Sequence, residues 1–400
     1  MSQGIEAHRL SWARRAADVG MNADRLVNLT RVFEREVASG LLPGMVALVS
    51  RRGELVYFES CGRLNPVASA PMVHDSIFRI YSMTKPVVSV AAMMLTEEGR
   101  LLLHEPVSAW LPEFAQMQVG MEHGDRLEYE PAREPITIQD LLRHTAGLTY
   151  GFLGSSPVHR LYSDERLGAP DIGNARFCEQ LARLPLIAQP GSAWAYSHAT
   201  DVLGRVIEVI SGQSLGAFLQ ERIFAPLGMV DTGFQVAPAH QHRIAEPHAI
   251  DPQGGIKIEL LDVRQAHAFE SGGGGLVSTA ADFARFLQCL SQGGSLAGTR
   301  LIGRQTLAFM TADHLGDRPV LGDVLPAGHG FGLGFAVRRE AGLAPLPGSK
   351  GLYYWGGIAG TAFFVDPVLD LFAVLMIQAP VQRHRYRALF RHLVYAAIDD

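Results

Sequence analysis

The chain has 400 residues, too many for one small compact core, so two lobes or one large mixed domain are expected. Hydrophobic residues make up 48% of it and charged residues 19%, a globular composition that excludes disordered, collagen-like and coiled-coil proteins. A net charge of −5 gives no general attraction to nucleic acid or anionic lipid, so neither is expected as a partner.

The cysteines and the apolar runs bear on the expected compartment. Cys61, Cys178 and Cys289 are odd in number, lie far apart and form no zinc-binding spacing, so we expect reduced thiols in a reducing environment. The first twenty residues contain no apolar run long enough for a signal peptide, and no run of about 18 apolar residues occurs elsewhere. We therefore expect a soluble, cytoplasmic protein.

The first part of the chain predicts a helix and a hairpin. Apolar residues recur at helical spacing over residues 22–39, which indicates an amphipathic helix. Two strand-like runs follow at 45–51 and 54–59, and Arg52-Gly53 between them predicts a tight turn.

Helical patterns dominate the middle of the chain, from Ser82 to about Leu290. Examples are residues 137–143, 200–210, 215–224 and 280–290. Towards the carboxyl end, strands are predicted at 331–339, 361–366 and 371–378, with a turn at Asp366–Asp370, and a final helix is predicted over 381–397.

This order of elements predicts an α+β fold. An antiparallel sheet built from both chain ends would be flanked by helices, as an α/β sandwich. Residues 1–81 and 291–400 would form this sheet lobe, and residues 82–290 would form an inserted, mostly helical lobe. The cleft between the lobes is the expected site.

Ser82 and Lys85 form a Ser-x-x-Lys sequence at the predicted start of a buried helix. Pro86 fits only the first helical turn, and the run from Val87 to Leu95 is apolar nearly all round. Residues three apart share a helix face, so the amine can reach the hydroxyl, and a buried amine is a better base. We favour a nucleophilic serine with its base over a capping serine beside a solvent-reaching lysine.

A second serine fits another nucleophile pattern. Ser214 lies in Gly212-Gln213-Ser214-Leu215-Gly216, which matches Gly-x-Ser-x-Gly. That motif needs a preceding strand, whereas residues 201–210 have helical spacing. We therefore expect Ser214 to cap the next helix.

The sequence Ser82-Met83-Thr84-Lys85 resembles the first motif of the class C β-lactamase and penicillin-binding protein superfamily. Within this superfamily, the chain resembles the family VIII carboxylesterases most closely. Further segments resemble family landmarks in the same order. These are residues 136–148, Tyr196-Ser197-His198, residues 221–234, residues 272–282 and Trp355-Gly356-Gly357.

The resemblance implies a β-lactamase/transpeptidase-like fold and an acyl-enzyme reaction without a cofactor. Ser82 would be the nucleophile, Lys85 its base and Tyr196 a second proton-transfer group. The oxyanion hole would be the backbone N–H groups of Ser82 and Ile358. The acyl-enzyme would form from an ester, release an alcohol and be hydrolysed by water.

Two departures from the lactamase pattern concern the substrate. Trp355 stands where lactamases carry a cation, and an aromatic wall suits uncharged esters. His198 replaces a common amide and would contact substrate or support Tyr196. The predicted substrate-binding residues are Trp355, Gly356, Gly357, His198, Tyr150 and Phe152.

Other conspicuous groups have structural explanations. His240, His242 and His248 lack the spacing of a metal site and are expected in an exposed loop, so no metal ligand is assigned. Gly272 to Gly275 is expected to be a tight connection rather than a nucleotide loop. The arginines near the end are expected to form a solvated helix face; they are Arg383, Arg385, Arg387 and Arg391.

The sequence thus predicts a serine carboxylesterase for small uncharged esters with short acyl chains. Two alternatives stay open. The same site would serve a β-lactamase, peptidase, amide hydrolase or acyltransferase, and a non-catalytic binding module would keep the fold alone.

Overall fold

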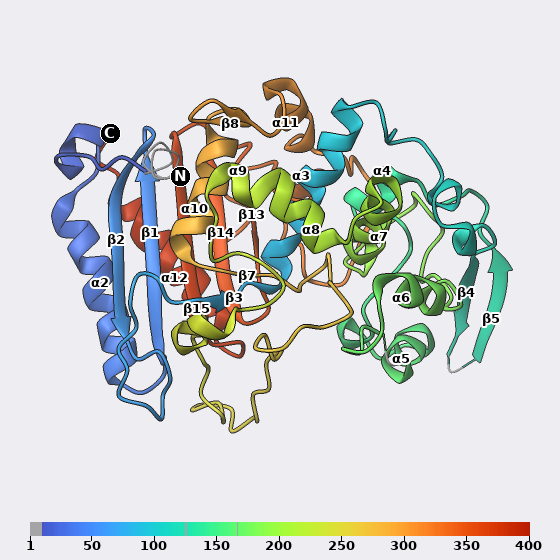
Figure 1. Ribbon diagram of the computed structural model, residues 1–400, viewed down its shortest axis with the longest axis horizontal. Coiled ribbons are helices and arrows are strands. Elements are labelled where there is room, and N and C mark those ends of the chain that lie inside the picture. The colour runs from blue at the N-terminus through green and yellow to red at the C-terminus, as the bar shows by residue number, and fades with distance from the viewer. Residues whose placement is uncertain (1–9, 125, 166) are drawn as a thin grey trace.

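The computed structural model describes residues 10–124, 126–165 and 167–400, which form a sheet region and a largely helical region (Figure 1). The first nine residues, on which part of the signal-peptide expectation rests, lie outside the described residues. The division predicted at residues 82 and 290 stays a prediction. The structure places one helix of the middle segment, α10 (Ala280–Ser291), against the sheet.

Among the described residues, the main sheet has seven strands, and each pair of neighbours is antiparallel, as predicted. In spatial order they are β11 (His329–Phe331), β12 (Ala336–Arg338), β13 (Tyr353–Gly356), β14 (Gly360–Asp366), β15 (Leu371–Gln378), β1 (Gly44–Arg51) and β2 (Glu54–Gly62). The predicted hairpin is confirmed. Arg52 and Gly53 have φ of 52° and 78°, as expected for a two-residue turn with both central residues left-handed.

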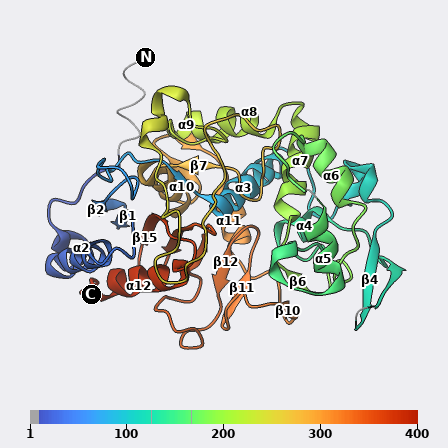
Figure 2. The ribbon, with the colours of Figure 1, turned by 90° about the horizontal axis from the view of Figure 1, so that it is seen from below.

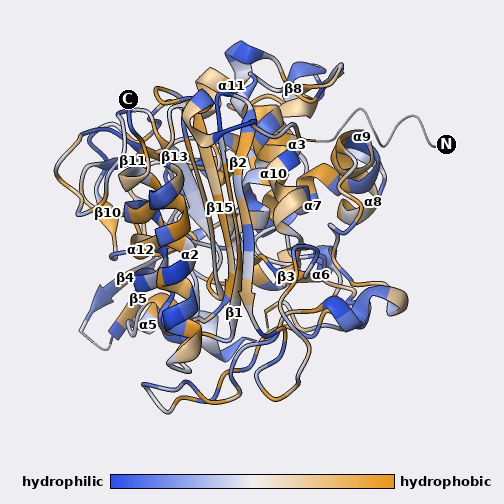
Figure 3. Cartoon of the chain, turned by 90° about the vertical axis from the view of Figure 1, so that its left-hand side faces the viewer, coloured by the Kyte–Doolittle hydropathy of each residue, from blue (hydrophilic) through white to orange (hydrophobic). Residues whose placement is uncertain are grey.

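Strands β1 and β15 are buried on both faces because helices cover each side of the sheet. Their side chains alternate between two hydrophobic clusters: Ala47 and Leu375 face α2 (Ala23–Ala38) and α12 (Arg383–Ala396), whereas Leu48 and Val374 face α10. Figure 2 shows α12 below these strands and α10 above them, and Figure 3 shows β15 largely apolar.

The helical region is built around α3 (Thr84–Glu97) and α7 (Ala199–Ser211), which pack against each other. No single described helix is long and apolar enough to cross a membrane, and α7 passes that test only jointly with 215–227, at a bend of 78°. The other helices here are α4 (Ile138–Leu142), α5 (Pro157–Asp164), α6 (Asn174–Leu181), α8 (Leu215–Leu219), a π-turn (Gln220–Phe224) and α9 (Ala225–Leu227).

Short strand pairs and one further helix complete the fold. The hairpin of β4 (Gln118–His123) and β5 (Arg126–Pro131) was not predicted, because its strands are largely exposed; it lies at the end of the molecule far from α2 (Figure 1). The other strand pairs are β3 (Phe78–Arg79) with β7 (Val277–Ser278), β6 (Trp194–Ala195) with β10 (Val320–Leu321), and β8 (Ser295–Leu296) with β9 (Thr299–Arg300), and the further α-helix is α11 (Arg304–Met310). Short 3-10 turns lie at Ala16–Val19, Val107–Ala109, Pro112–Phe114, Gly151–Leu153 and Pro238–Arg243.

Two predictions near the carboxyl end are wrong. The single strand predicted at 331–339 is two strands, β11 and β12, because the chain reverses at Gly332–Phe335, where Gly334 has a φ of +97°.

The second wrong prediction is the solvated arginine face of α12. Arg385 is half-exposed and pairs with Glu36, but Arg391 is only 4% exposed and Arg387 is half-buried. Tyr386, Phe390 and Val394 form the buried stripe of α12. Arg387 and Arg391 each lie one position after a stripe residue, at its edge, so they are covered with it.

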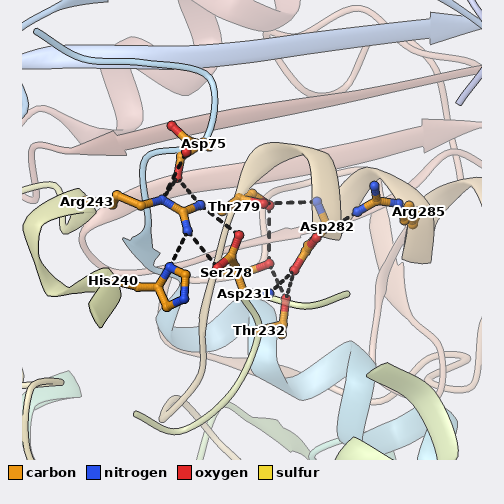
Figure 4. A network of polar contacts seen from close by, with 9 residues as sticks. All are labelled: Asp75, Asp231, Thr232, His240, Arg243, Ser278, Thr279, Asp282 and Arg285. Carbon is orange, nitrogen blue, oxygen red and sulfur yellow. Dashed lines mark hydrogen bonds and ion pairs between the residues drawn. The ribbon is translucent and has the colours of Figure 1, made fainter. Parts of the chain in front are cut away.

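A polar network joins the start of α10 to the loops below it (Figure 4). Thr279 caps α10, and Asp282 accepts the N–H of Asp231 at 2.7 Å and pairs with Arg285 at 2.8 Å. Burial raises the pKa of Asp282 to about 6. The network also contains Arg243, which pairs with Asp231 at 2.7 Å.

Candidate active site

Ser82 lies in a short 3-10 turn, η2 (Tyr81–Met83), directly before α3. The helix thus begins where Pro86 predicted. Tyr81 has a φ of +44°, a left-handed conformation that is strained for a tyrosine and turns the chain sharply at the serine. Ser82 is half-buried and lines the main cavity.

The amine of Lys85 is buried beside Ser82, at 1% residue exposure. Its Nζ lies 3.4 Å from Ser82 Oγ, 2.9 Å from the Tyr150 hydroxyl and 2.6 Å from the Gly273 carbonyl oxygen. The Gly273 carbonyl can only accept, so one amine proton is committed to it. The remaining positions of the nitrogen face two hydroxyl groups, which is an arrangement suited to proton transfer.

Two tyrosines contact the Lys85 amine in different ways. The Tyr150 hydroxyl accepts from the Lys85 amine. Burial, with Asp201 and Tyr196 nearby, raises the pKa of Tyr150 well above its usual value, so it stays a phenol. Tyr196 presents its ring, with the centroid 4.6 Å from Nζ. Its hydroxyl accepts the indole N–H of Trp355 at 3.1 Å, and it bonds to neither Ser82 nor Lys85 among the described residues.

Asp201 is a buried charge that orders the other side of the site. Its carboxylate accepts from His198 Nδ1 at 3.0 Å, Ser271 Oγ at 2.6 Å and the Gly273 N–H at 2.8 Å. Burial alone would raise the pKa of Asp201, but its interactions with His198, chiefly a hydrogen bond and then a Coulomb attraction, outweigh burial and lower the pKa below its usual value.

Gly273 links this carboxylate to the lysine through its backbone, since its N–H donates to Asp201 and its carbonyl accepts from Lys85. A Cβ at this position would lie 2.6 Å from an Asp201 oxygen and 2.9 Å from the Tyr150 hydroxyl, so only glycine fits. The predicted tight connection at 272–275 is therefore part of the site.

The strand end after Trp355 forms the opposite wall. Gly356 and Ile358 line the cavity with Trp355, and Gly357 lies behind them. A Cβ on Gly357 would overlap the carbonyl oxygen of Ile80, so this glycine permits close approach to the chain that leads into Ser82 rather than to a ligand.

The cavity that these residues share has a volume of about 970 Å³. Ser82, Tyr150, Tyr196 and His198 line one part of it, and apolar side chains line much of the rest. The latter include Leu153, Phe234, Ile256, Phe269, Val324 and Phe363. Phe152 is at the rim and 66% exposed. Charged side chains also line it, among them Lys257, Glu259, Asp323 and Arg383. A cavity of this size with a mainly apolar lining suits a small organic ligand.

The structure thus brings the predicted Ser82, Lys85, Tyr196, His198, Tyr150, Trp355 and Ile358 into one place. Sequence reasoning missed Asp201, although its position three residues after His198 on a helix start was a usable signal. It also missed Gly273, whose partners come from distant segments.

The rival serine, the loop histidines and the cysteines lie outside this site. Ser214 caps α8 by accepting the Ala217 N–H and does not line the cavity. His240 and His242 are exposed as expected, but His248 is half-buried. No group of three or more potential metal ligands occurs among the described residues. Cys61, Cys178 and Cys289 are free.

The chain is similar to several known proteins. The Beta-lactamase family matches residues 29–396. Rv1367c of Mycobacterium tuberculosis is 39% identical over 86% of this chain and 88% of its own. Esterase EstB of Burkholderia gladioli is 32% identical over 88% of this chain and 90% of its own. The solved structure of EstCE1, a hydrolase with promiscuous acyltransferase activity, is similar with a TM-score of 0.78 at 30% identity, covering 93% of this chain and 99% of its own.

Proposed function

Because the chain belongs to the beta-lactamase family and is a serine hydrolase related to esterases, we propose that it is a carboxylesterase for small uncharged esters with short acyl chains. The observation that carries this proposal is the contact between Ser82 Oγ and the buried Lys85 amine beside a largely apolar cavity.

Lys85 takes the serine proton in the first step. A neutral amine has two protons and one lone pair, and Gly273 and Tyr150 can occupy the two protons. The lone pair then faces Ser82 Oγ at 3.4 Å, a length that shortens when substrate is bound. As Oγ attacks the ester carbonyl carbon, its proton moves to Nζ and a tetrahedral oxyanion forms.

Tyr196 supplies the proton that the leaving alcohol needs. The Trp355 indole can only donate, so the Tyr196 oxygen is an acceptor in that bond and its own proton is left for the cavity. When the tetrahedral intermediate collapses, the C–O bond to the alcohol breaks and the alkoxide takes this proton. A proton from the Lys85 ammonium restores the phenol through water in the cavity, because Nζ lies over the Tyr196 ring and not beside its hydroxyl. Water then hydrolyses the acyl group from Ser82.

The preference for uncharged esters is supported by Trp355, which lies at 6% exposure in the wall where a lactamase-like enzyme would carry a cation for a carboxylate.

Acyl transfer is the second candidate, because EstCE1 is described as a hydrolase with promiscuous acyltransferase activity, and 99% of its chain matches this structure. An alcohol in place of water would then accept the acyl group. Product analysis with added alcohols separates the two, and nitrocefin turnover comparable to ester turnover would favour a lactamase instead.

The proposed nucleophile is tested against its rival serine. Ser82→Ala should abolish hydrolysis of p-nitrophenyl butyrate, whereas Ser214→Ala removes only a helix cap and should leave activity per folded molecule nearly intact. The opposite pattern would show that the wrong serine had been chosen.

A further inference from the structure

Arg387 lies on α12, packs against the turn that joins β13 to β14 and also lines the cavity. Its Nη2 donates to the carbonyl oxygen of Gly357 and, at 3.0 Å, to that of Thr361, and its Nε lies 3.4 Å from the carbonyl oxygen of Gly360. One guanidinium, whose donors are fixed in a plane, thus gathers three carbonyl groups of a single turn. The position of this turn is therefore set by α12 as well as by the sheet.

The peptide between Gly357 and Ile358 is held at its carbonyl end. The Gly357 oxygen accepts from Arg387 and also from the Gly360 N–H at 2.9 Å. In a trans peptide the C=O and N–H point in opposite directions, so the Ile358 N–H points away from α12. Ile358 lines the cavity, and its N–H has no acceptor within residues 10–124, 126–165 and 167–400.

The same turn is fastened to the segment that carries the nucleophile. Thr361 Oγ1 donates to the Ile80 carbonyl at 3.2 Å, and the Gly357 N–H donates to the Thr361 carbonyl at 2.8 Å. Ser82 follows Ile80 by two residues. The backbone N–H groups of Ser82 and Ile358 are therefore held in a fixed relation by short, buried contacts.

The charge of Arg387 has no carboxylate partner in the described part of the chain. Burial and the nearby Arg383 lower the pKa of Arg387 to about 10, which still leaves it a cation at neutral pH. A cation donating to a carbonyl oxygen polarises that peptide and makes its N–H a stronger donor. It also favours negative charge on the far side of the peptide.

From these contacts we propose that Arg387 is a positioning residue of the oxyanion hole, which orients the Gly357–Ile358 peptide and strengthens the Ile358 N–H as a donor to the oxyanion. The inference rests on the proposed function, because an oxyanion forms only if Ser82 attacks an ester. An arginine that merely joined α12 to the sheet would stabilise the fold without favouring the transition state over bound substrate.

The test compares Arg387→Met and Arg387→Lys with wild type and with Arg385→Met. Arg385 is the matched control, since it lies on the same helix but pairs with Glu36 at the surface. For each protein we would measure kcat and KM for p-nitrophenyl butyrate and the rate of fluorophosphonate labelling at Ser82. The affinity for an alkyl trifluoromethyl ketone, which forms a tetrahedral oxyanion on serine, is measured alongside the folded fraction.

Arg387→Met should lower kcat/KM, labelling rate and ketone affinity together by about 30- to 100-fold, somewhat less than direct loss of a donor, with KM changed by less than about threefold. Arg387→Lys keeps the charge but loses the planar donor set, so its kcat/KM, labelling rate and ketone affinity should each fall by about 10-fold. Arg385→Met should match wild type in all three quantities.

The proposal would be overturned if either Arg387 variant, per folded molecule, kept its ketone affinity and its kcat/KM within about threefold of the wild-type values. If Arg387→Met does not fold, Arg387→Lys decides the question by the same criterion. Failure of the proposed function has a different signature, because wild type itself would then show neither ester hydrolysis nor labelling at Ser82, and the inference would fall with it.

Discussion

Replacing Tyr150 by Phe removes only the hydroxyl that contacts Lys85, 2.9 Å away, and leaves the ring in its stack with Phe152 and its contact with His198. The lost hydrogen bond is worth about 1 kcal/mol while the amine is neutral and about 2 to 3 kcal/mol once it carries the serine proton. The transition state therefore loses about 1 to 2 kcal/mol more than the ground state, which lowers kcat/KM by about 5- to 30-fold.

Tyr196→Phe should have a larger effect that depends on the leaving group. Loss of a proton-transfer group costs about 10²- to 10⁴-fold in rate. An alkoxide needs that proton and p-nitrophenolate does not, so the loss should be large for ethyl butyrate and much smaller for p-nitrophenyl butyrate. The variant also leaves the Trp355 N–H without its acceptor, which costs about 1 to 3 kcal/mol of stability.

The assay is therefore kcat/KM for both esters on both variants. Tyr150→Phe should affect the two esters equally, because burial holds the pKa of Tyr150 well above its usual value and the phenol gives up no proton to the leaving group. A leaving-group dependence in Tyr150→Phe would refute this division of roles and assign the proton transfer to Tyr150.

Two further predictions concern the oxyanion turn and the α10 network. Gly357→Ala would place a Cβ against the Ile80 carbonyl and 2.5 Å from Thr361 Oγ1. The turn must then move by about 1 Å, so kcat/KM should fall by about 10²-fold. An unchanged kcat/KM would argue against an oxyanion hole at this turn. The raised pKa of Asp282, about 6, means that the folded protein holds this proton more tightly than the unfolded chain. Its stabilising contribution is full below about pH 4 and is lost as pH rises through 6, by about 3 kcal/mol. Urea unfolding of wild type and Asp282→Asn from pH 4 to 7 should show that difference, and a pH-independent gap would contradict it.

What the sequence could predict depended on how local the signal was. Ser82, Lys85 and Pro86 lie within one turn of helix, so spacing alone placed the amine beside the hydroxyl. The hairpin at Arg52-Gly53 is equally local. The sheet was predicted from runs rich in aromatic and β-branched residues, whereas the exposed β4–β5 hairpin carries little of that signal.

The remaining site residues depend on contacts between distant segments. Asp201 and Gly273 meet only because α7 and the loop before β7 pack together. Arg387 looked like one of several surface arginines, and its role depends on the carbonyl groups that β13 and β14 place beside α12. Its spacing of four from Arg383 and Arg391, next to a buried stripe, was the one usable hint.

The most direct test of the whole account is to trap the covalent intermediate. Wild-type protein mixed with excess p-nitrophenyl butyrate and quenched in acid within milliseconds should gain the mass of one butyryl group, and peptide mapping should place it on Ser82. An acyl group on Ser214, or continued ester hydrolysis by a Ser82→Ala protein with no acyl adduct in either form, would contradict it.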